Sequence, residues 1–329
     1  MPHPGPRILV VAPNWIGDAL LAQPLLARLR EKVPRLRLDA LAPAWVAPVL
    51  RRMAEIEDVI EAAFRHGAVD LRARWRLGRR LRERSYDQAI VLPNSWKSAL
   101  VPFFADIPLR SGYVGESRYG LLNLLYREKA GGREPMALHY ARLSEKPGSV
   151  PREPLSEPHL RVDPAAARAT AVRFGIDGAY AVFCPGAEYG PAKRWPYFAG
   201  LCAKISVPVV LLGSAADRET CAAIGGRNLA GETSLDEAIE LVSGAQFVVT
   251  NDSGLMHVAA AVGTPEVALF GSSSPHHTSP LSERARVLWL GIECSPCYAR
   301  ECPLGHFRCM REMTVERVLD EIVALRAAS

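Results

Sequence analysis

Residues 246–275, QFVVTNDSGLMHVAAAVGTPEVALFGSSSP, carry the pattern that decides the fold. The apolar run before Thr250 predicts a strand, and the residues after Gly254 predict a helix, a second strand and a loop of small polar residues. The polar turn at 250–254 therefore lies where a strand meets a helix. Ligands bind at this junction in open α/β sheets, and the unpaired N–H groups at the helix start can receive a diphosphate.

The length and composition of the chain predict two globular domains. Its 329 residues exceed what one core usually covers, and 49% hydrophobic with 23% charged residues suffice for packed interiors. No apolar run approaches the roughly 20 residues of a membrane span. The first residues, MPHPGPRILVVAP, lack the pattern of a signal peptide, so we expect a cytoplasmic protein.

Charge is distributed unevenly along the chain. Residues 1–165 hold 26 Lys+Arg and 18 Asp+Glu, a net of +8, whereas residues 166–329 hold 14 and 17, a net of −3. A run of arginines in 65–84 is compatible with a solvated helix face. Four of these arginines share a helical stripe that suits phosphate or carboxylate: Arg72, Arg76, Arg79 and Arg80. An anionic small ligand and an anionic membrane surface both fit, but without aromatic-interleaved basic motifs we expect no nucleic acid.

Strands and helices alternate along both halves, which predicts parallel sheets in an α/β fold. In the first half, strands are predicted at 7–13, 35–43, 57–63 and 86–95, and helices at 19–32, 44–53 and 65–84. Residues 144–165 carry five prolines and predict a linker. In the second half, strands are predicted at 179–186 and 207–214, a further α/β segment at 227–233, and helices after Pro196, from Ala216, from Ser234 and over 314–328.

The turn after the first strand, Pro13-Asn14-Trp15-Ile16-Gly17-Asp18, contains a candidate catalytic residue. Neither half has GxGxxG after its first strand, which argues against a dinucleotide-dependent oxidoreductase. Asp18 opens a helix, and a carboxylate there can simply favour the helix dipole. It can also act as a general base, since a base facing an acceptor hydroxyl must be a carboxylate or His within hydrogen-bond reach.

The second half offers candidate ligands for a nucleotide sugar. In CPGAEYGPAKRWP (184–196), Lys193 follows a turn of small residues and suits a leaving diphosphate, although it could be a surface lysine. Asp217 follows a buried strand and could accept from two ribose hydroxyls or cap a helix. Asp252 would repel a diphosphate, so we assign it to sugar hydroxyls, with the neighbouring N–H groups taking the phosphates. His257 lies on the same helix face as Ser253 and fits a packed core histidine best.

These pieces together resemble the lipopolysaccharide heptosyltransferases of glycosyltransferase family 9. The resemblance covers nearly the whole chain except the linker and a cysteine-rich segment, and its motifs are VAPNWIGDALLAQPLL, LAPAWVAPVLRRM, VLPNSWKSALVPFFA, GYVGESRYGLLN, FCPGAEYGPAKRWP, NLAGETSLDEAIELV and VVTNDSGLMHVAAA. It implies a GT-B fold, with two Rossmann-like domains and the active site in the cleft between them. Residues 1–160 would bind the acceptor and 161–329 ADP-heptose, and the C-terminal helix could cross back.

The resemblance also implies an inverting transfer of L-glycero-D-manno-heptose from ADP-heptose onto the first heptose of the lipopolysaccharide inner core, on a Kdo2-lipid A acceptor. The catalytic aspartate falls on Asp18 and the phosphate-binding lysine on Lys193. Donor-binding residues are expected at Gly186, Ala187, Asp217, Asn251, Asp252, Ser253, Gly254 and His257. Acceptor-binding residues are expected at Asn94, Lys97, Arg110 and Arg118. No cofactor is expected to be required.

The same sequence pattern is also compatible with a family member that adds the first or third heptose, with a nucleotide-sugar epimerase, or with a binding module of the same fold. An epimerase needs acid/base groups on both faces of the sugar, so a single Asp18 fits transfer better. The basic first half and the lipid acceptor predict peripheral contact with the inner face of the cytoplasmic membrane.

The sequence departs from this family at Cys294, Cys297, Cys302 and Cys309, with His306 among them. Four cysteines this close are compatible with a structural zinc site, because tetrahedral thiolate groups suit zinc. The second pair is not CxxC, which weakens that interpretation. Free thiols packing a loop are the alternative, and disulfides are not expected in a reducing cytoplasm.

Overall fold

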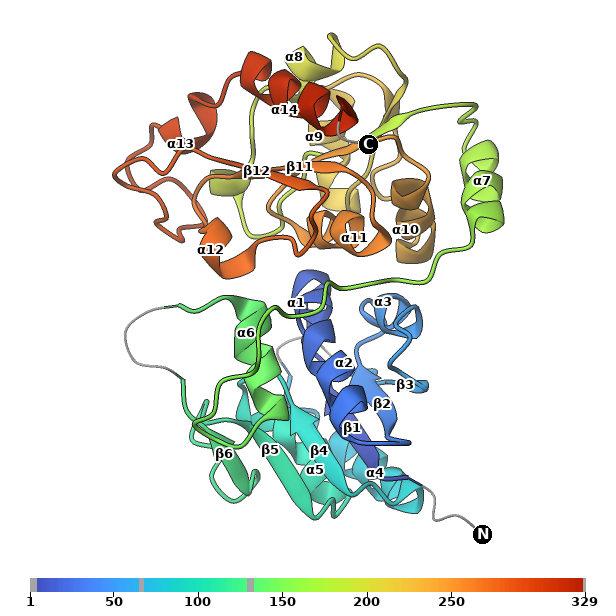
Figure 1. Cartoon of the computed structure of the whole chain (residues 1–329), viewed down its shortest axis with the longest axis vertical. Helices are drawn as coiled ribbons and strands as arrows, with labels where there is room; N and C mark the ends of the chain where they lie inside the picture. The colour runs from blue at the N-terminus through green and yellow to red at the C-terminus, as the bar shows by residue number, and fades with distance from the viewer. Residues whose placement is uncertain (1–4, 65–67, 129–132, 328–329) are drawn as a thin grey trace. The chain divides into compact units, whose positions relative to one another are not determined.

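The computed structural model describes residues 5–64, 68–128 and 133–327, and it separates into two compact units, 1–157 and 158–329 (Figure 1). Each unit is built around a parallel sheet in which the described residues form six strands. Among the described residues, no helix is long and apolar enough to cross a membrane. The α/β architecture with two Rossmann-like sheets that the sequence predicts is confirmed.

The first unit carries a sheet of order β3-β2-β1-β4-β5-β6. Its strands are β1 (Arg7–Val11), β2 (Arg37–Ala42), β3 (Asp58–Glu61), β4 (Gln88–Val91), β5 (Leu109–Tyr113) and β6 (Leu124–Tyr126). Its helices are α1 (Ile16–Leu21), α2 (Gln23–Lys32), α3 (Ala47–Arg51), α4 (Leu71–Leu81), α5 (Leu100–Phe104) and α6 (Met136–Ala141), with 3₁₀ turns η1 (Arg82–Arg84), η2 (Trp96–Ala99) and η3 (Arg142–Ser144). Side chains of α4 and α5 pack with those of β1 and β4 in one buried cluster.

The second unit carries a sheet of order β12-β11-β10-β7-β8-β9. Its strands are β7 (Ala181–Cys184), β8 (Val209–Leu211), β9 (Arg227–Asn228), β10 (Val248–Asn251), β11 (Glu266–Phe270) and β12 (Ala285–Trp289). Its helices are α7 (Pro164–Arg173), α8 (Phe198–Cys202), α9 (Arg218–Ala222), α10 (Leu235–Ser243), α11 (Gly254–Val262), α12 (Pro275–Thr278), α13 (Arg308–Arg311) and α14 (Val315–Ala327), with 3₁₀ turns η4 (Pro191–Lys193) and η5 (Ala215–Asp217).

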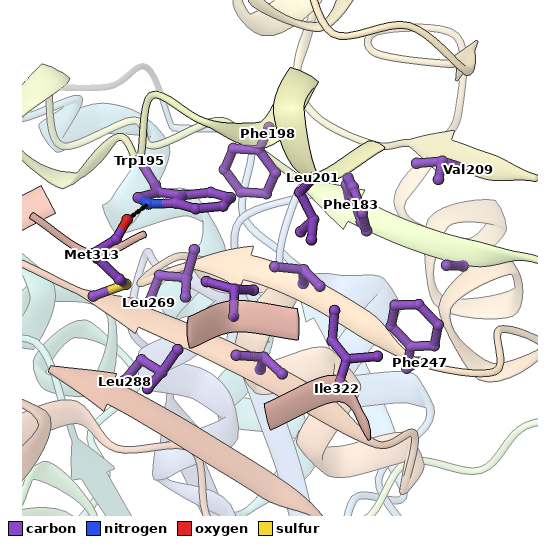
Figure 2. Close-up of a cluster of buried hydrophobic side chains, with 14 of the residues drawn as sticks. Phe183, Trp195, Phe198, Leu201, Val209, Phe247, Leu269, Leu288, Met313 and Ile322 are labelled. Atoms are coloured by element: carbon purple, nitrogen blue, oxygen red, sulfur yellow. Dashed lines mark hydrogen bonds between the residues drawn. The ribbon is translucent and has the colours of Figure 1, made fainter. Parts of the chain in front are cut away.

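The core of the second unit fixes the C-terminal helix and the loop after β7. Ile322 of α14 packs with Leu201 of α8 over the buried face of β7, β10 and β11 (Figure 2). The indole Nε1 of Trp195 donates to the Met313 carbonyl at 2.7 Å. Helix α14 therefore packs on the sheet of the second unit, and Trp195 anchors the end of the loop that carries Lys193.

Both sheets share the doubly wound strand order, and this determines where ligands bind. In the first unit the order reverses between β1 and β4, and in the second between β7 and β10. Crevices at the carboxyl ends of such strand pairs are the ligand sites of open α/β folds. The candidate residues after β1, β4, β7 and β10 therefore lie at these crevices.

Several local predictions differ from the structure. The helix predicted over 19–32 is two helices, α1 and α2, because Pro24 lacks an N–H and is tolerated only in the first turn of a helix. Strands β5, β6 and β12 escaped prediction, since β6 has three residues and β5 carries Gly112 and Arg110. In contrast, the helix predicted from Ser234 is confirmed as α10, with Ser234 as its N-cap and a capping box between Ser234 and Glu237.

Candidate active site

In the second unit, Asn251 connects the end of β10 to the loop after β7 at the crevice. It is the last residue of β10 and is fully buried. Its Nδ2 donates to the Pro185 carbonyl at 2.7 Å, and its Oδ1 accepts from the Trp195 N–H at 3.1 Å. Asn251 therefore holds the loop after β7 against the end of β10, and its amide is committed to this support.

Lys193 and Asp252 form an ion pair at this crevice. Lys193 Nζ lies 2.5 Å from Asp252 Oδ2, and the Ser273 hydroxyl donates to the same oxygen at 2.5 Å. The lysine side chain retains 16% exposure and the aspartate 6%. Lys193 also lies over the ring of Tyr189, with Nζ 5.1 Å from the ring centroid. Both residues were predicted to bind the donor, but their pairing was not predicted.

Asp217 lies behind the small-residue turn that precedes Lys193. Its Oδ2 accepts from the Ser214 N–H at 3.0 Å and from the Ser214 hydroxyl at 2.7 Å, so it caps η5 as well as facing the turn. A Cβ on Gly186 would lie 2.6 Å from Asp217 Oδ1, which only glycine avoids. Arg194 Nη2 stands 3.8 Å from the same oxygen. The predicted donor residues Gly186 and Asp217 are therefore neighbours.

The start of α11 faces the same crevice. Ser253 is its N-cap, and Gly254 is the first helical residue, so the first N–H groups of a nine-residue helix point outward at this end. His257, one turn further along, is 5% exposed, and burial lowers its pKa to about 4. It is a neutral core histidine, as its position in the sequence suggested. Ala187 is buried beside the loop and shapes the turn.

In the first unit, Asp18 lies in the first turn of α1, partly exposed, after the end of β1. The buried hydroxyl of Tyr140 in α6 is close enough for the Asp18 charge to help raise the Tyr140 pKa well above its usual value, although burial is the larger cause. Asp18 is thus a carboxylate at a strand end that solvent and a ligand can reach.

A cavity of about 170 Å³ opens at the carboxyl ends of β1, β2 and β4. Lys97, one of the predicted acceptor residues, lines it. So do Trp45, Phe64 and Arg74, which the sequence analysis did not single out. The Arg74 guanidinium lies 4.0 Å from the Phe64 ring centroid and donates to the Lys97 carbonyl at 3.1 Å.

Two predicted acceptor residues have other roles in the structure. Arg118 is 1% exposed and donates to the carbonyls of Tyr113 and Pro93 and to Asn94 Oδ1, so it fastens the loop after β4. Burial lowers its pKa to about 10. Arg110 lies near the start of β5, at the opposite end of the sheet, and donates to the Ile107 and Leu121 carbonyls. Exposed Asn94 and partly buried Lys97 lie on the same segment after β4, and Arg110 does not.

Three exposed tryptophans follow strand ends of this unit and were also missed. Trp15, Trp45 and Trp96 are 50%, 48% and 39% exposed and come after β1, β2 and β4. The Trp45 indole N–H donates to the Asn14 carbonyl at 2.9 Å, which fixes its ring. The signal was available, since each tryptophan stands just after a predicted strand where a buried residue is not expected.

The four clustered cysteines of the second unit lie beside the loop that carries Lys193. Cys294, Cys297, Cys302, Cys309 and His306 line a second cavity of about 40 Å³ together with Ala192. All seven cysteines of the chain are free thiols. Among the described residues, no group of three or more His, Cys, Asp or Glu side chains is placed to hold a metal ion.

Comparison with known proteins agrees with this geometry. Residues 74–308 match glycosyltransferase family 9 (heptosyltransferase). The chain is 42% identical to lipopolysaccharide heptosyltransferase 2 of Escherichia coli K12, over 97% of this chain and 98% of that protein. It is 40% identical to lipooligosaccharide heptosyltransferase 2 of Haemophilus influenzae, over 98% and 99%. The structure of E. coli ADP-heptose LPS heptosyltransferase II superposes with a TM-score of 0.87 at 41% identity, covering 97% and 98%.

The chain has two Rossmann-like units, each with a group of polar residues where its strand order reverses. A heptosyltransferase structure matches it over nearly its full length, so the chain is a glycosyltransferase. The resemblance to the lipopolysaccharide heptosyltransferases inferred from the motifs is confirmed, and these relatives are heptosyltransferases II. The chain belongs to glycosyltransferase family 9, the heptosyltransferases.

Proposed function

We propose that this enzyme transfers L-glycero-D-manno-heptose from ADP-heptose to the first heptose of the lipopolysaccharide inner core. The observation that carries the proposal is the 40–42% identity, over nearly the whole of both chains, to proteins named heptosyltransferase 2. Asp18, Lys193 and Asp252 lie in the segments that follow β1, β7 and β10, and this supports the proposal, because a transferase needs both a base and a diphosphate-binding cation.

The second unit is the proposed donor site. The diphosphate of ADP-heptose would contact the first N–H groups of α11 at Ser253 and Gly254, with Lys193 as its cation. Asp217 and Asp252 would accept from donor hydroxyl groups. Because Lys193 and the α11 start together supply positive charge, we propose that the chemistry requires no cofactor. Omitting divalent cations from the assay should then leave turnover unchanged.

The proposed reaction is a single displacement with inversion. Asp18 accepts the proton of the attacking acceptor hydroxyl, whose oxygen forms a bond to the anomeric carbon of the heptose. The bond between that carbon and the diphosphate oxygen breaks, and ADP leaves with the electron pair. Negative charge grows on the diphosphate as the bond breaks, so Lys193 and the α11 N–H groups stabilise the transition state.

The first unit is the proposed acceptor site. Its cavity combines cationic Lys97 with the exposed ring of Trp45, which suits a phosphorylated sugar with one apolar face. Buried Arg74 would hold the Lys97 segment through its hydrogen bond to the Lys97 carbonyl. Asn94 would donate to acceptor hydroxyls. Arg118 would support the loop of Asn94 rather than bind the acceptor, since its donors are used by the protein.

We further propose peripheral contact with the inner face of the cytoplasmic membrane through the outer face of α4. This face presents Trp75, 49% exposed, among four exposed arginines: Arg72, Arg76, Arg79 and Arg80. Within the described residues, none of these four guanidinium groups has a hydrogen bond or ion pair. Each basic group near an anionic bilayer contributes about 1 kcal/mol, and Trp favours the interface.

The test of transfer is incubation with ADP-heptose and truncated inner-core acceptors, followed by ADP release and mass spectrometry. We expect a mass gain of one heptose only on acceptors that already carry the first heptose. A gain on heptose-free acceptors would instead indicate addition of the first heptose. Conversion of the donor without any acceptor would indicate an epimerase and refute the proposal.

The test of membrane contact is sedimentation with vesicles of anionic or zwitterionic phospholipid. Changing Arg72, Arg76, Arg79 and Arg80 to Gln should abolish binding to anionic vesicles. The matched control removes the same charge from exposed arginines of the second unit: Arg218, Arg227, Arg286 and Arg317. Equal losses in both variants would mean that net charge, not the α4 face, governs binding.

A further inference from the structure

The segment 290–307, here called the cysteine loop, has no helix or strand although it is 18 residues long. Loops longer than about 12–15 residues without secondary structure are uncommon in compact domains and are usually functional. This one joins β12 to α13 and carries three of the clustered cysteines, with Cys309 in α13 itself. Its conformation therefore has to be stabilised by interactions other than the backbone hydrogen bonds of a helix or sheet.

All four clustered thiols converge on one small space. The cavity of about 40 Å³ is lined by Cys294, Cys297, Cys302 and Cys309, and also by His306. Cys294 Sγ lies 4.0 Å from His306 Nε2, and Cys302 Sγ accepts from the Phe307 N–H at 3.4 Å. A space of this size exceeds the roughly 10–15 Å³ that a single water needs, so it can hold an ion.

Ser272 provides a second and independent sign that the cavity receives a ligand. It follows β11, is 1% exposed, and lines the same cavity. Its hydroxyl is buried and has no hydrogen-bond partner among the described residues. A buried hydroxyl without a partner costs about 1–3 kcal/mol. A thiolate or a metal-bound ligand in the cavity would accept its proton in a hydrogen bond.

We propose that the cysteine loop binds one Zn²⁺ ion through the thiolates of Cys294, Cys297, Cys302 and Cys309. Zinc prefers four tetrahedral sulfur or nitrogen ligands at about 2.3 Å for sulfur. Each thiol releases its proton to solvent when it binds. Because no three ligands stand at metal-holding distances among the described residues, binding draws the sulfurs inward, and Ser272 donates to one of them as an outer-shell partner.

The loop reaches the segment that carries Lys193. The Arg300 carbonyl accepts from the Ala192 N–H at 3.0 Å, and the Tyr298 carbonyl accepts from the Tyr189 hydroxyl at 2.7 Å. A Cβ on Gly190 would clash with the Arg300 carbonyl. Zinc in the cysteine loop therefore holds the backbone of the segment that carries Lys193, and loss of zinc makes residues 189–194 more mobile.

The first test is metal analysis of the full chain purified without chelator. We expect about one zinc per chain, and loss of that zinc in Cys294→Ser and Cys302→Ser. Cys202→Ser is the matched control, because Cys202 is a partly buried thiol of α8 outside the cluster, and should keep its zinc. If the cluster variants fail to fold, thiol titration of the wild-type chain decides. Four thiols that react only after a strong chelator support the site, whereas four thiols titrating in metal-free protein, or a disulfide between them, overturn it.

The second test measures the link to the donor loop without using activity. Removing zinc should speed tryptic cleavage after Lys193 and Arg194, read by mass spectrometry, by roughly fivefold or more, a usual size for coupling between two sites. Readdition of zinc should reverse the change. Cleavage after Arg168, in α7 on another part of the unit, serves as the control. Equal rates with and without zinc at Lys193 would overturn the positioning role.

Discussion

The Lys193–Asp252 ion pair makes two roles of Lys193 separable by experiment. Lys193→Met keeps the apolar stem of the side chain but removes the ammonium group from Asp252, whose side chain is 6% exposed and keeps its hydrogen bond from Ser273. Removing one partner of a fully buried pair costs about 3–5 kcal/mol, but Lys193 keeps 16% exposure, so water can partly replace it. We therefore expect a loss of about 1–3 kcal/mol, as for a buried acceptor left unsatisfied.

The assay is thermal and urea unfolding, together with turnover. For a domain of this size, a loss of 2 kcal/mol lowers Tm by about 4–8 °C. Lys204→Met is the matched control, because its ion pair with Glu316 is exposed, at 49% and 67%, and contributes about 0–1 kcal/mol. The double variant Lys193→Met with Asp252→Asn should regain much of the stability but not the turnover. A double variant whose loss equals the sum of the single losses would refute the pairing.

Three further predictions test other parts of the structure. Asp18→Asn should lower turnover about 10²–10⁴-fold while ADP binding by calorimetry is kept, and near-normal turnover would end the assignment as base. Gly186→Ala should displace Asp217 and weaken donor use up to about 100-fold, whereas Gly200→Ala, whose Cβ would meet only Val315 at 3.5 Å, should not. Burial raises the pKa of Glu266 well above its usual value, so stability present at acid pH is lost as pH rises from the unfolded pKa toward the folded one. Glu266→Gln should remove this dependence, up to about 1.4 kcal/mol per pH unit, and an unchanged slope in urea unfolding between pH 5 and 8 would contradict it.

The strand ends were predictable from sequence because parallel strands are continuous apolar runs followed by polar turns. Asn251 ends β10, Asp252 follows it, and Asp18 opens the helix after β1, so each lies near a reversal of strand order. The sheet order brings them to the crevices without any specific long-range contact having to be guessed. For this reason the local sequence pattern alone predicts where the candidate residues of each unit lie.

The roles of the basic residues were less predictable, because an arginine in a sequence does not reveal what its guanidinium contacts. Arg118 looks like a surface ligand for phosphate, yet its donors bind carbonyls of Pro93 and Tyr113, which come from two different strand ends. Arg110 lies near the start of β5, whereas Arg118 lies in the connection from β5 to the parallel strand β6. Such assignments depend on tertiary hydrogen bonds, which periodicity does not encode.

The ion pair also answers the electrostatic objection to an acid beside a diphosphate. Asp252 alone would repel the donor, but Lys193 Nζ, 2.5 Å from Asp252 Oδ2, offsets the charge of that carboxylate. Under the proposed function, the Lys193 ammonium leaves Asp252 and pairs with the diphosphate, because two phosphate charges attract the ammonium more strongly than one carboxylate does. The Asp252 carboxylate would then keep its hydrogen bond from Ser273 and could accept a second one from a hydroxyl of the donor. Donor binding would then move Lys193 from its ion pair with Asp252 to the leaving diphosphate, so the pair that stabilises the unit would also prepare the proposed donor site.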